Sequence, residues 1–190
     1  RQADVGFASE PLDWNTTYYW RVDEVNAANP DSPWKGAVWS FTTADFLIVD
    51  DFESYTADMD AGEGVWQTWI DGYGVADNGA QVGNLLPPYC EQLKIHGGSQ
   101  SMPLFYINET GATNSEAVLP LTTLRDWTVA GVNELSLWIR GDSANAAEPL
   151  YAAIYNLQRA PAIVAYDEPD VATKAAWTQW RIPLQIFADQ

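Results

Sequence analysis

The chain of 190 residues contains one cysteine and one histidine. Cys90 therefore has no partner for an internal disulfide, and its surroundings lack the ligand spacing of a metal site. A zinc site or a Ser-His arrangement would depend on His96 alone, and this residue precedes Gly97-Gly98, a context that predicts a turn. No glycine-rich phosphate loop, nucleophile elbow or paired-histidine helix is present. We expect a protein that is not an enzyme.

Positive charge is also scarce. Nine Lys and Arg residues stand against 26 Asp and Glu residues, which gives a net charge of -17. Such a charge would repel a nucleic-acid backbone and an anionic membrane surface. No apolar run approaches the roughly 20 residues that span a bilayer. We expect no nucleic-acid partner and no membrane insertion, whereas a neutral ligand or a cation fits the charge.

Aromatic residues are abundant. They make up 13% of the chain and include ten tryptophans, while the hydrophobic fraction of 47% is ordinary for a globular protein. Tryptophan at this frequency indicates large contact surfaces, either in a core or on a platform where a ligand stacks.

The pattern of hydrophobic residues predicts an all-β fold. Helical periodicity is rare, and short alternating runs are separated by Gly, Pro, Asn and Asp. Many short strands with turns between them are typical of an antiparallel β-sandwich. The expected strands are residues 17–25, 37–43, 46–52, 64–70, 101–107, 133–140, 150–155, 162–166 and 177–184.

The first 44 residues have a pattern of their own. Leu12 stands six residues before Tyr18, alternation follows from Tyr18 to Val22, and Trp39-Ser-Phe-Thr-Thr closes the segment. This resembles the last two strands of a fibronectin type III module with its tyrosine corner at Tyr18, although Trp14 stands where that family usually has Pro. Because two strands alone are marginal in water, we expect either a chain cut from a longer protein or strands supplied by another chain.

Residues 45–190 resemble the carbohydrate-binding modules of the galactose-binding-like β-sandwich class. Four segments in the expected order carry the resemblance: VDDFE at 49–53, HGGSQSMPLFY at 96–106, VNELSLWIRG at 132–141 and WTQWRIPLQIF at 177–187. The resemblance implies a jelly-roll sandwich that lacks its last strand or strands here. It also implies a non-catalytic module of a secreted or cell-surface protein of bacterial type.

The stretch FLIVDDFESY, residues 46–55, runs from apolar residues directly into carboxylates. On a strand, Asp51 and Glu53 would share one face about 7 Å apart, and Phe52 would enter the core. Calcium accepts such oxygens and completes its shell with backbone carbonyls. The pattern predicts a structural calcium site at Asp51 and Glu53; the alternative is a strand end that leaves the core for water.

Aromatic residues on two expected strands indicate a ligand surface. Alternation places Trp138 and Arg140 on the face opposite the strand's leucines, and Tyr151 and Tyr155 on one face of the next strand. If the two strands are adjacent, these side chains form an aromatic and basic strip on which sugar rings can pack. Trp177 shares its face with polar residues and is a further candidate. The alternative is a second layer of core, or a surface beneath a neighbouring module.

The predicted role is attachment of a larger protein to a polysaccharide or glycan, next to neighbouring modules of the same polypeptide. Fold alone supports this only by analogy. One alternative is a structural or filament-forming surface protein whose sandwich contacts other protein subunits. Another is an accessory or catalytic part of a polysaccharide-degrading enzyme, which would need two close carboxylates if it were catalytic.

Overall fold

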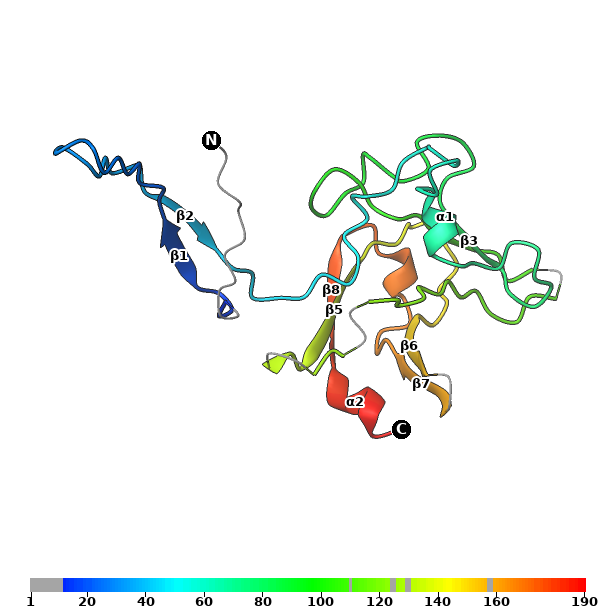
Figure 1. Cartoon of the computed structure of the whole chain (residues 1–190). Helices are drawn as coiled ribbons and strands as arrows, with labels where there is room; N and C mark the ends of the chain where they lie inside the picture. The colour runs from blue at the N-terminus through cyan, green and yellow to red at the C-terminus, as the bar shows by residue number, and fades with distance from the viewer. Residues whose placement is uncertain (1–11, 110, 124–125, 129–130, 157–158) are drawn as a thin grey trace. The chain divides into compact units, whose positions relative to one another are not determined.

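The structure is a computed structural model that describes residues 12–109, 111–123, 126–128, 131–156 and 159–190 (Figure 1). It divides into two compact units, with the division between Ile48 and Val49. The boundary expected from the sequence lies slightly earlier, between residues 44 and 45. Residues 1–11 of the expected fibronectin-like segment lie outside the described residues.

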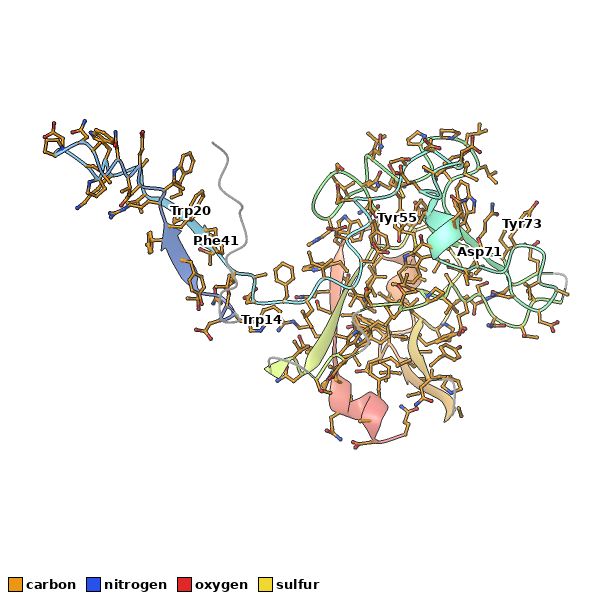
Figure 2. All side chains as sticks on the ribbon, in the orientation of Figure 1. Trp14, Trp20, Phe41, Tyr55, Asp71 and Tyr73 are labelled. Atoms are coloured by element: carbon orange, nitrogen blue, oxygen red, sulfur yellow. The ribbon has the colours of Figure 1, made fainter. Side chains whose placement is uncertain are left out.

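The described part of the first unit forms a two-stranded antiparallel sheet of β1 (Thr17–Trp20) and β2 (Trp39–Thr42). Its register brings two aromatic pairs together. The rings of Tyr18 and Phe41 stack with centroids 5.8 Å apart, and those of Trp20 and Trp39 stack with centroids 6.2 Å apart. Figure 2 labels one residue of each pair, Phe41 and Trp20. The Asp13 backbone N–H donates to the Tyr18 hydroxyl at 2.8 Å, which is the type of contact that a tyrosine corner makes. No residue that the structure describes in this unit is buried.

Among its described residues, the second unit contains three antiparallel strand pairs and short helical segments. The strands are β3 (Ala80–Val82) paired with β4 (Leu104–Tyr106), β5 (Glu134–Ile139) paired with β8 (Thr178–Pro183), and β6 (Tyr151–Asn156) paired with β7 (Arg159–Ala165). The helical segments are α1 (Val65–Thr68), the 3-10 turn η2 (Val171–Thr173) and α2 (Leu184–Ala188). The all-β prediction is confirmed at this level, and the jelly-roll sandwich stays a prediction.

One core lies between two of these strand pairs. Trp180 and Ile182 of β8 are buried together with Phe187 of α2, and side chains from β5, β6 and β7 pack against them. Alternation explains this arrangement, because every second residue of β5 and β8 points to the same side of the sheet. Trp180 and Ile182 are therefore core residues.

A second core surrounds α1. It consists of buried Tyr55, Val65, Val82 and Cys90, with partly buried aromatic residues packed against them. Burial raises the pKa of the Cys90 thiol to about 11, with a smaller contribution from the charges of nearby carboxylates. The lone cysteine is therefore a core residue.

Two predicted strands are wrong. Residues 46–52 form no strand, and the expected strand at 64–70 contains the one-turn helix α1. The first difference follows from Asp50, whose carboxylate accepts hydrogen bonds from the Phe52 N–H at 2.8 Å, the Tyr55 hydroxyl at 2.5 Å and Trp69 Nε1 at 2.7 Å. Phe52 takes a positive φ of 64° in the resulting turn. An extended strand could not bring these donors to one carboxylate.

The strand β3 was not expected from the sequence. Its three residues follow the turns within residues 73–77, and the N–H of Val82, in the strand itself, donates to Asp71 Oδ2 at 2.8 Å.

None of the described helices is both long and apolar enough to cross a membrane.

The Asp50 carboxylate provides a stability test. We expect Asp50→Asn to lower the free energy of unfolding by about 1–3 kcal/mol, because one carbonyl oxygen replaces two and leaves partly buried donors unsatisfied. Asp51→Asn is the matched control, since Asp51 is exposed and, among the residues that the structure describes, its carboxylate accepts a hydrogen bond only from the Glu53 N–H at 3.1 Å. Urea unfolding followed by tryptophan fluorescence measures both variants. Equal losses for the two would contradict the role given to Asp50.

Candidate functional site

The outer face of the β5–β8 pair carries polar residues and one exposed tryptophan. The register places Trp138 opposite Gln179 and Ser136 opposite Arg181, and directly opposed residues share a face. Gln179 Nε2 donates to Ser136 Oγ at 2.9 Å. Trp138 is 44% exposed. This face is therefore accessible and able to offer both an aromatic plane and hydrogen-bonding groups.

Three aromatic rings meet on this face, and we call His96, Trp138 and Trp177 the aromatic cluster. The imidazole of His96 stacks on Trp138 with ring centroids 3.7 Å apart and an angle of 20°. Trp177 meets the same imidazole edge-on at 5.7 Å and 69°. Both tryptophans were predicted site residues. His96 was missed, because a His-Gly-Gly segment signals a turn and carries no sign of its distant stacking partner.

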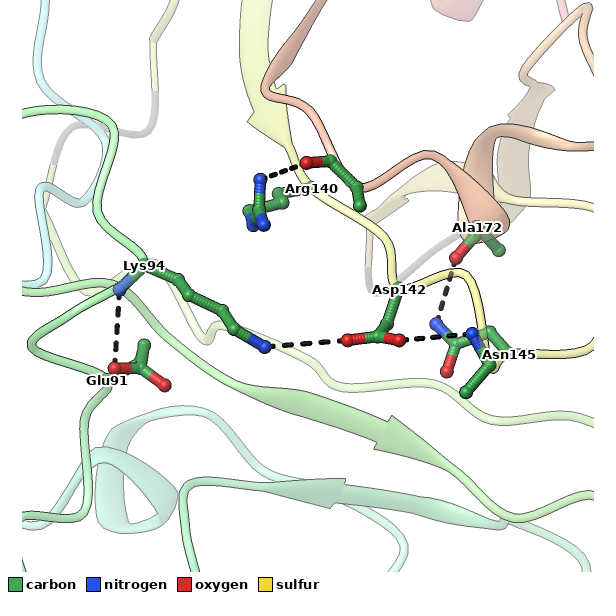
Figure 3. A network of polar contacts seen from close by, with 8 residues as sticks. Glu91, Lys94, Arg140, Asp142, Asn145 and Ala172 are labelled. Carbon is green, nitrogen blue, oxygen red and sulfur yellow. Dashed lines mark hydrogen bonds and ion pairs between the residues drawn. The ribbon is translucent and has the colours of Figure 1, made fainter.

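Arg140 lies two residues after Trp138 on the same face, but its guanidinium already makes a hydrogen bond within the chain. Its Nη1 donates to the Ala175 carbonyl (Figure 3), and its Nε is a buried side-chain nitrogen with no hydrogen-bond partner among the described residues. Beyond β5, Lys94 Nζ lies 3.4 Å from Asp142 Oδ2. The pKa of Asp142 is lowered mainly by the Ala144 N–H and then by Lys94. Both charged side chains are about half exposed, so their ion pair adds little stability.

Tyr151 and Tyr155 form a separate cluster around Glu116. Their hydroxyls donate to the two oxygens of this carboxylate, at 2.9 Å for Tyr151 and 2.5 Å for Tyr155. Burial is the main cause that raises the pKa of Tyr155 to about 12, and the hydrogen bond to Glu116 adds to it. The pKa of Tyr151 is also raised, again chiefly by burial.

The predicted single strip of aromatic and basic residues is therefore wrong. β5 pairs with β8, and β6 pairs with β7, so the two strands are not hydrogen-bonded neighbours. Their inner faces share one core, which leaves Trp138 and Arg140 on the outer face of one pair and Tyr151 and Tyr155 on that of the other. The structure brings Trp138 and Trp177 together and keeps the tyrosines apart from them.

The chain matches no protein-family model, no curated protein and no solved structure. The aromatic cluster can pack against the apolar face of a ligand, while Ser136, Gln179 and Arg181 offer hydrogen bonds beside it. That combination suits a neutral, hydroxyl-rich molecule.

The carboxylates predicted to bind calcium have other partners. Both oxygens of Glu53 accept hydrogen bonds from residues 99–100, and Asp51 Oδ1 accepts the Glu53 N–H. The Ser99 hydroxyl is the main cause that lowers the pKa of Glu53. Within the described ranges, no three His, Cys, Asp or Glu side chains are grouped as metal ligands. Calcium binding at Asp51 and Glu53 remains a prediction that this arrangement does not support.

Calcium addition and chelation test that site directly. An ion that binds only the folded state raises the melting temperature by mass action. Because the oxygens of Glu53 already have donors, we expect the melting temperature to be the same in millimolar calcium and in excess EGTA. A calcium-dependent rise that Asp51→Asn abolishes would restore the ion site.

The cluster around Glu116 makes a second prediction. We expect Glu116→Gln to lower the pKa of Tyr155 from about 12 toward the ordinary value of 10.0, because the carboxylate no longer disfavours the phenolate. Between these pH values the folded state holds the proton more tightly, so stability should fall as pH rises, and fall less in the variant. Phenolate absorbance measures the titration, and Tyr155→Phe identifies the signal. An unchanged titration in Glu116→Gln would exclude this coupling.

Proposed function

We propose that this chain is a non-catalytic carbohydrate-binding or adhesion module of a larger secreted or cell-surface protein. In this proposal it attaches that protein to a polysaccharide through the aromatic cluster. The observation that supports it best is the 44% exposed Trp138, which lies with His96 and Trp177 on an otherwise polar outer face. A jelly-roll sandwich is the fold proposed with it, supported by the core shared between β5–β8 and β6–β7.

Carbohydrate suits this surface for physical reasons. Sugar rings expose C–H groups that pack against aromatic planes, and their hydroxyls need donors and acceptors close by. Ser136 and Gln179 supply neutral groups, and Arg181 supplies a cation that is engaged with Glu134 at 3.1 Å. The net charge of -17 favours a neutral glycan over an anionic one.

The test is binding to a panel of soluble neutral polysaccharides, namely β-glucan, xylan, galactomannan and laminarin. We expect at least one to bind, and Trp138→Ala to weaken that binding by about threefold to tenfold, the value of one aromatic contact. Isothermal calorimetry or affinity electrophoresis measures the loss. Tyr73→Ala is the control, because Tyr73 is a highly exposed aromatic residue outside the aromatic cluster (Figure 2).

Binding that Trp138→Ala and Tyr73→Ala reduce equally would count against the aromatic cluster as the site. No binding to any member of the panel would count against the function itself.

The second candidate function, contact with other protein subunits, is favoured by the exposed aromatic residues of the first unit: Trp20, Trp39 and Phe41 are 50%, 61% and 46% exposed. Concentration-dependent association without glycan binding would favour that candidate.

A further inference from the structure

The loop that follows His96 is held by one carboxylate from a distant part of the chain. Glu53 Oε1 accepts the backbone N–H groups of Ser99 at 2.9 Å and Gln100 at 3.3 Å, and Glu53 Oε2 accepts the Ser99 hydroxyl. A carboxylate that gathers several donors in this way fixes a loop more firmly than a neutral acceptor does.

The attachment is reciprocal. Gln100, which is only 9% exposed, donates from Nε2 to the carbonyls of Phe52 at 2.5 Å and Tyr55 at 2.9 Å. The segment 52–55 and the loop 98–100 therefore each supply donors or acceptors to the other. Neither can move alone without leaving polar groups unsatisfied.

Gly98 shows how closely the loop approaches Glu53. Its φ is +68°, and a Cβ placed there would lie 2.2 Å from Glu53 Oε1. Any side chain at this position would have to displace the carboxylate. The loop and the acid are thus fitted to one another within two residues of His96.

We propose that Glu53 is a positioning residue for the aromatic cluster: by holding the loop at residues 98–100, it keeps the His96 imidazole stacked on Trp138. This role differs from the predicted one as a calcium ligand. The identity of the ligand in this inference rests on the proposed glycan-binding function, whereas the position of His96 does not depend on that function. The polar imidazole held between Trp138 and Trp177 gives the cluster a hydrogen-bonding group that the two indoles do not offer on their faces.

The single histidine makes the geometry measurable without any ligand. In the wild-type protein, the ring current of Trp138 should shift the carbon-bound protons of His96 upfield in the NMR spectrum. Trp138→Ala should remove this shift and so identify it. We expect Glu53→Gln to remove most of the shift as well, since one amide oxygen cannot replace two carboxylate oxygens that accept three hydrogen bonds.

The matched control is Glu63→Gln. Glu63 is also an exposed glutamate that accepts a hydroxyl hydrogen bond, from Thr56 Oγ1 at 2.6 Å, but it lies outside the loop of His96. The Glu63→Gln substitution should leave the NMR shift of His96 unchanged. If Glu53→Gln fails to fold, Ser99→Ala removes only the hydroxyl donor and should reduce the shift partially.

Affinity for the best-binding polysaccharide of the panel completes the test. We expect Glu53→Gln to weaken it by about threefold to tenfold, the value of one or two hydrogen bonds that hold the site. A folded Glu53→Gln protein with an unchanged His96 shift overturns the proposal. A lost shift with unchanged affinity overturns the link between this position and binding. If the wild type binds no glycan, the proposed function fails, while the His96 shift still decides the role of Glu53.

Discussion

The segment at residues 50–55 is the constraint on which the second unit depends. Asp50 gathers donors from Tyr55 and Trp69, and so fixes the turn against the core that contains α1. The same turn directs Glu53 toward the loop at residues 98–100, and that loop leads to His96 on the outer face of β5–β8. The core around α1 and the candidate ligand surface are thus connected through Asp50 and Glu53, two acids of the same turn that have different partners.

The parts of the fold that the sequence predicts well are those in which alternation alone decides the outcome. In β5 and β8 an apolar residue follows a polar one, and each strand buries one face, so the positions of Trp180 and Ile182 could be read locally. The same alternation placed Trp138 on the outer face. The alternation already decides which side chains face the core, and strand pairing then decides only which residues lie opposite one another.

The errors arise where distant hydrogen bonds override a local pattern. FLIVDDFE has the composition of a strand end, but Asp50 bonds to Trp69, 19 residues away, and Glu53 bonds to Ser99, 46 residues away. No local signal distinguishes a solvated carboxylate from one with such partners. The strip of aromatics failed for a related reason, because consecutive strands β5 and β6 do not pair and Tyr155 instead meets Glu116, 39 residues distant.

The short distance between Gly98 and Glu53 also makes substitutions at these two positions depend on each other. A side chain at position 98 meets the Glu53 carboxylate, so it must displace that carboxylate from the loop, whereas a shorter residue at position 53 leaves room for it. Even then the positive φ of Gly98 admits Asn or Asp more readily than other residues. The two positions are therefore energetically coupled, and their substitutions will not add. A substitution at position 98 is therefore expected to cost less stability when the residue at position 53 is shorter than glutamate.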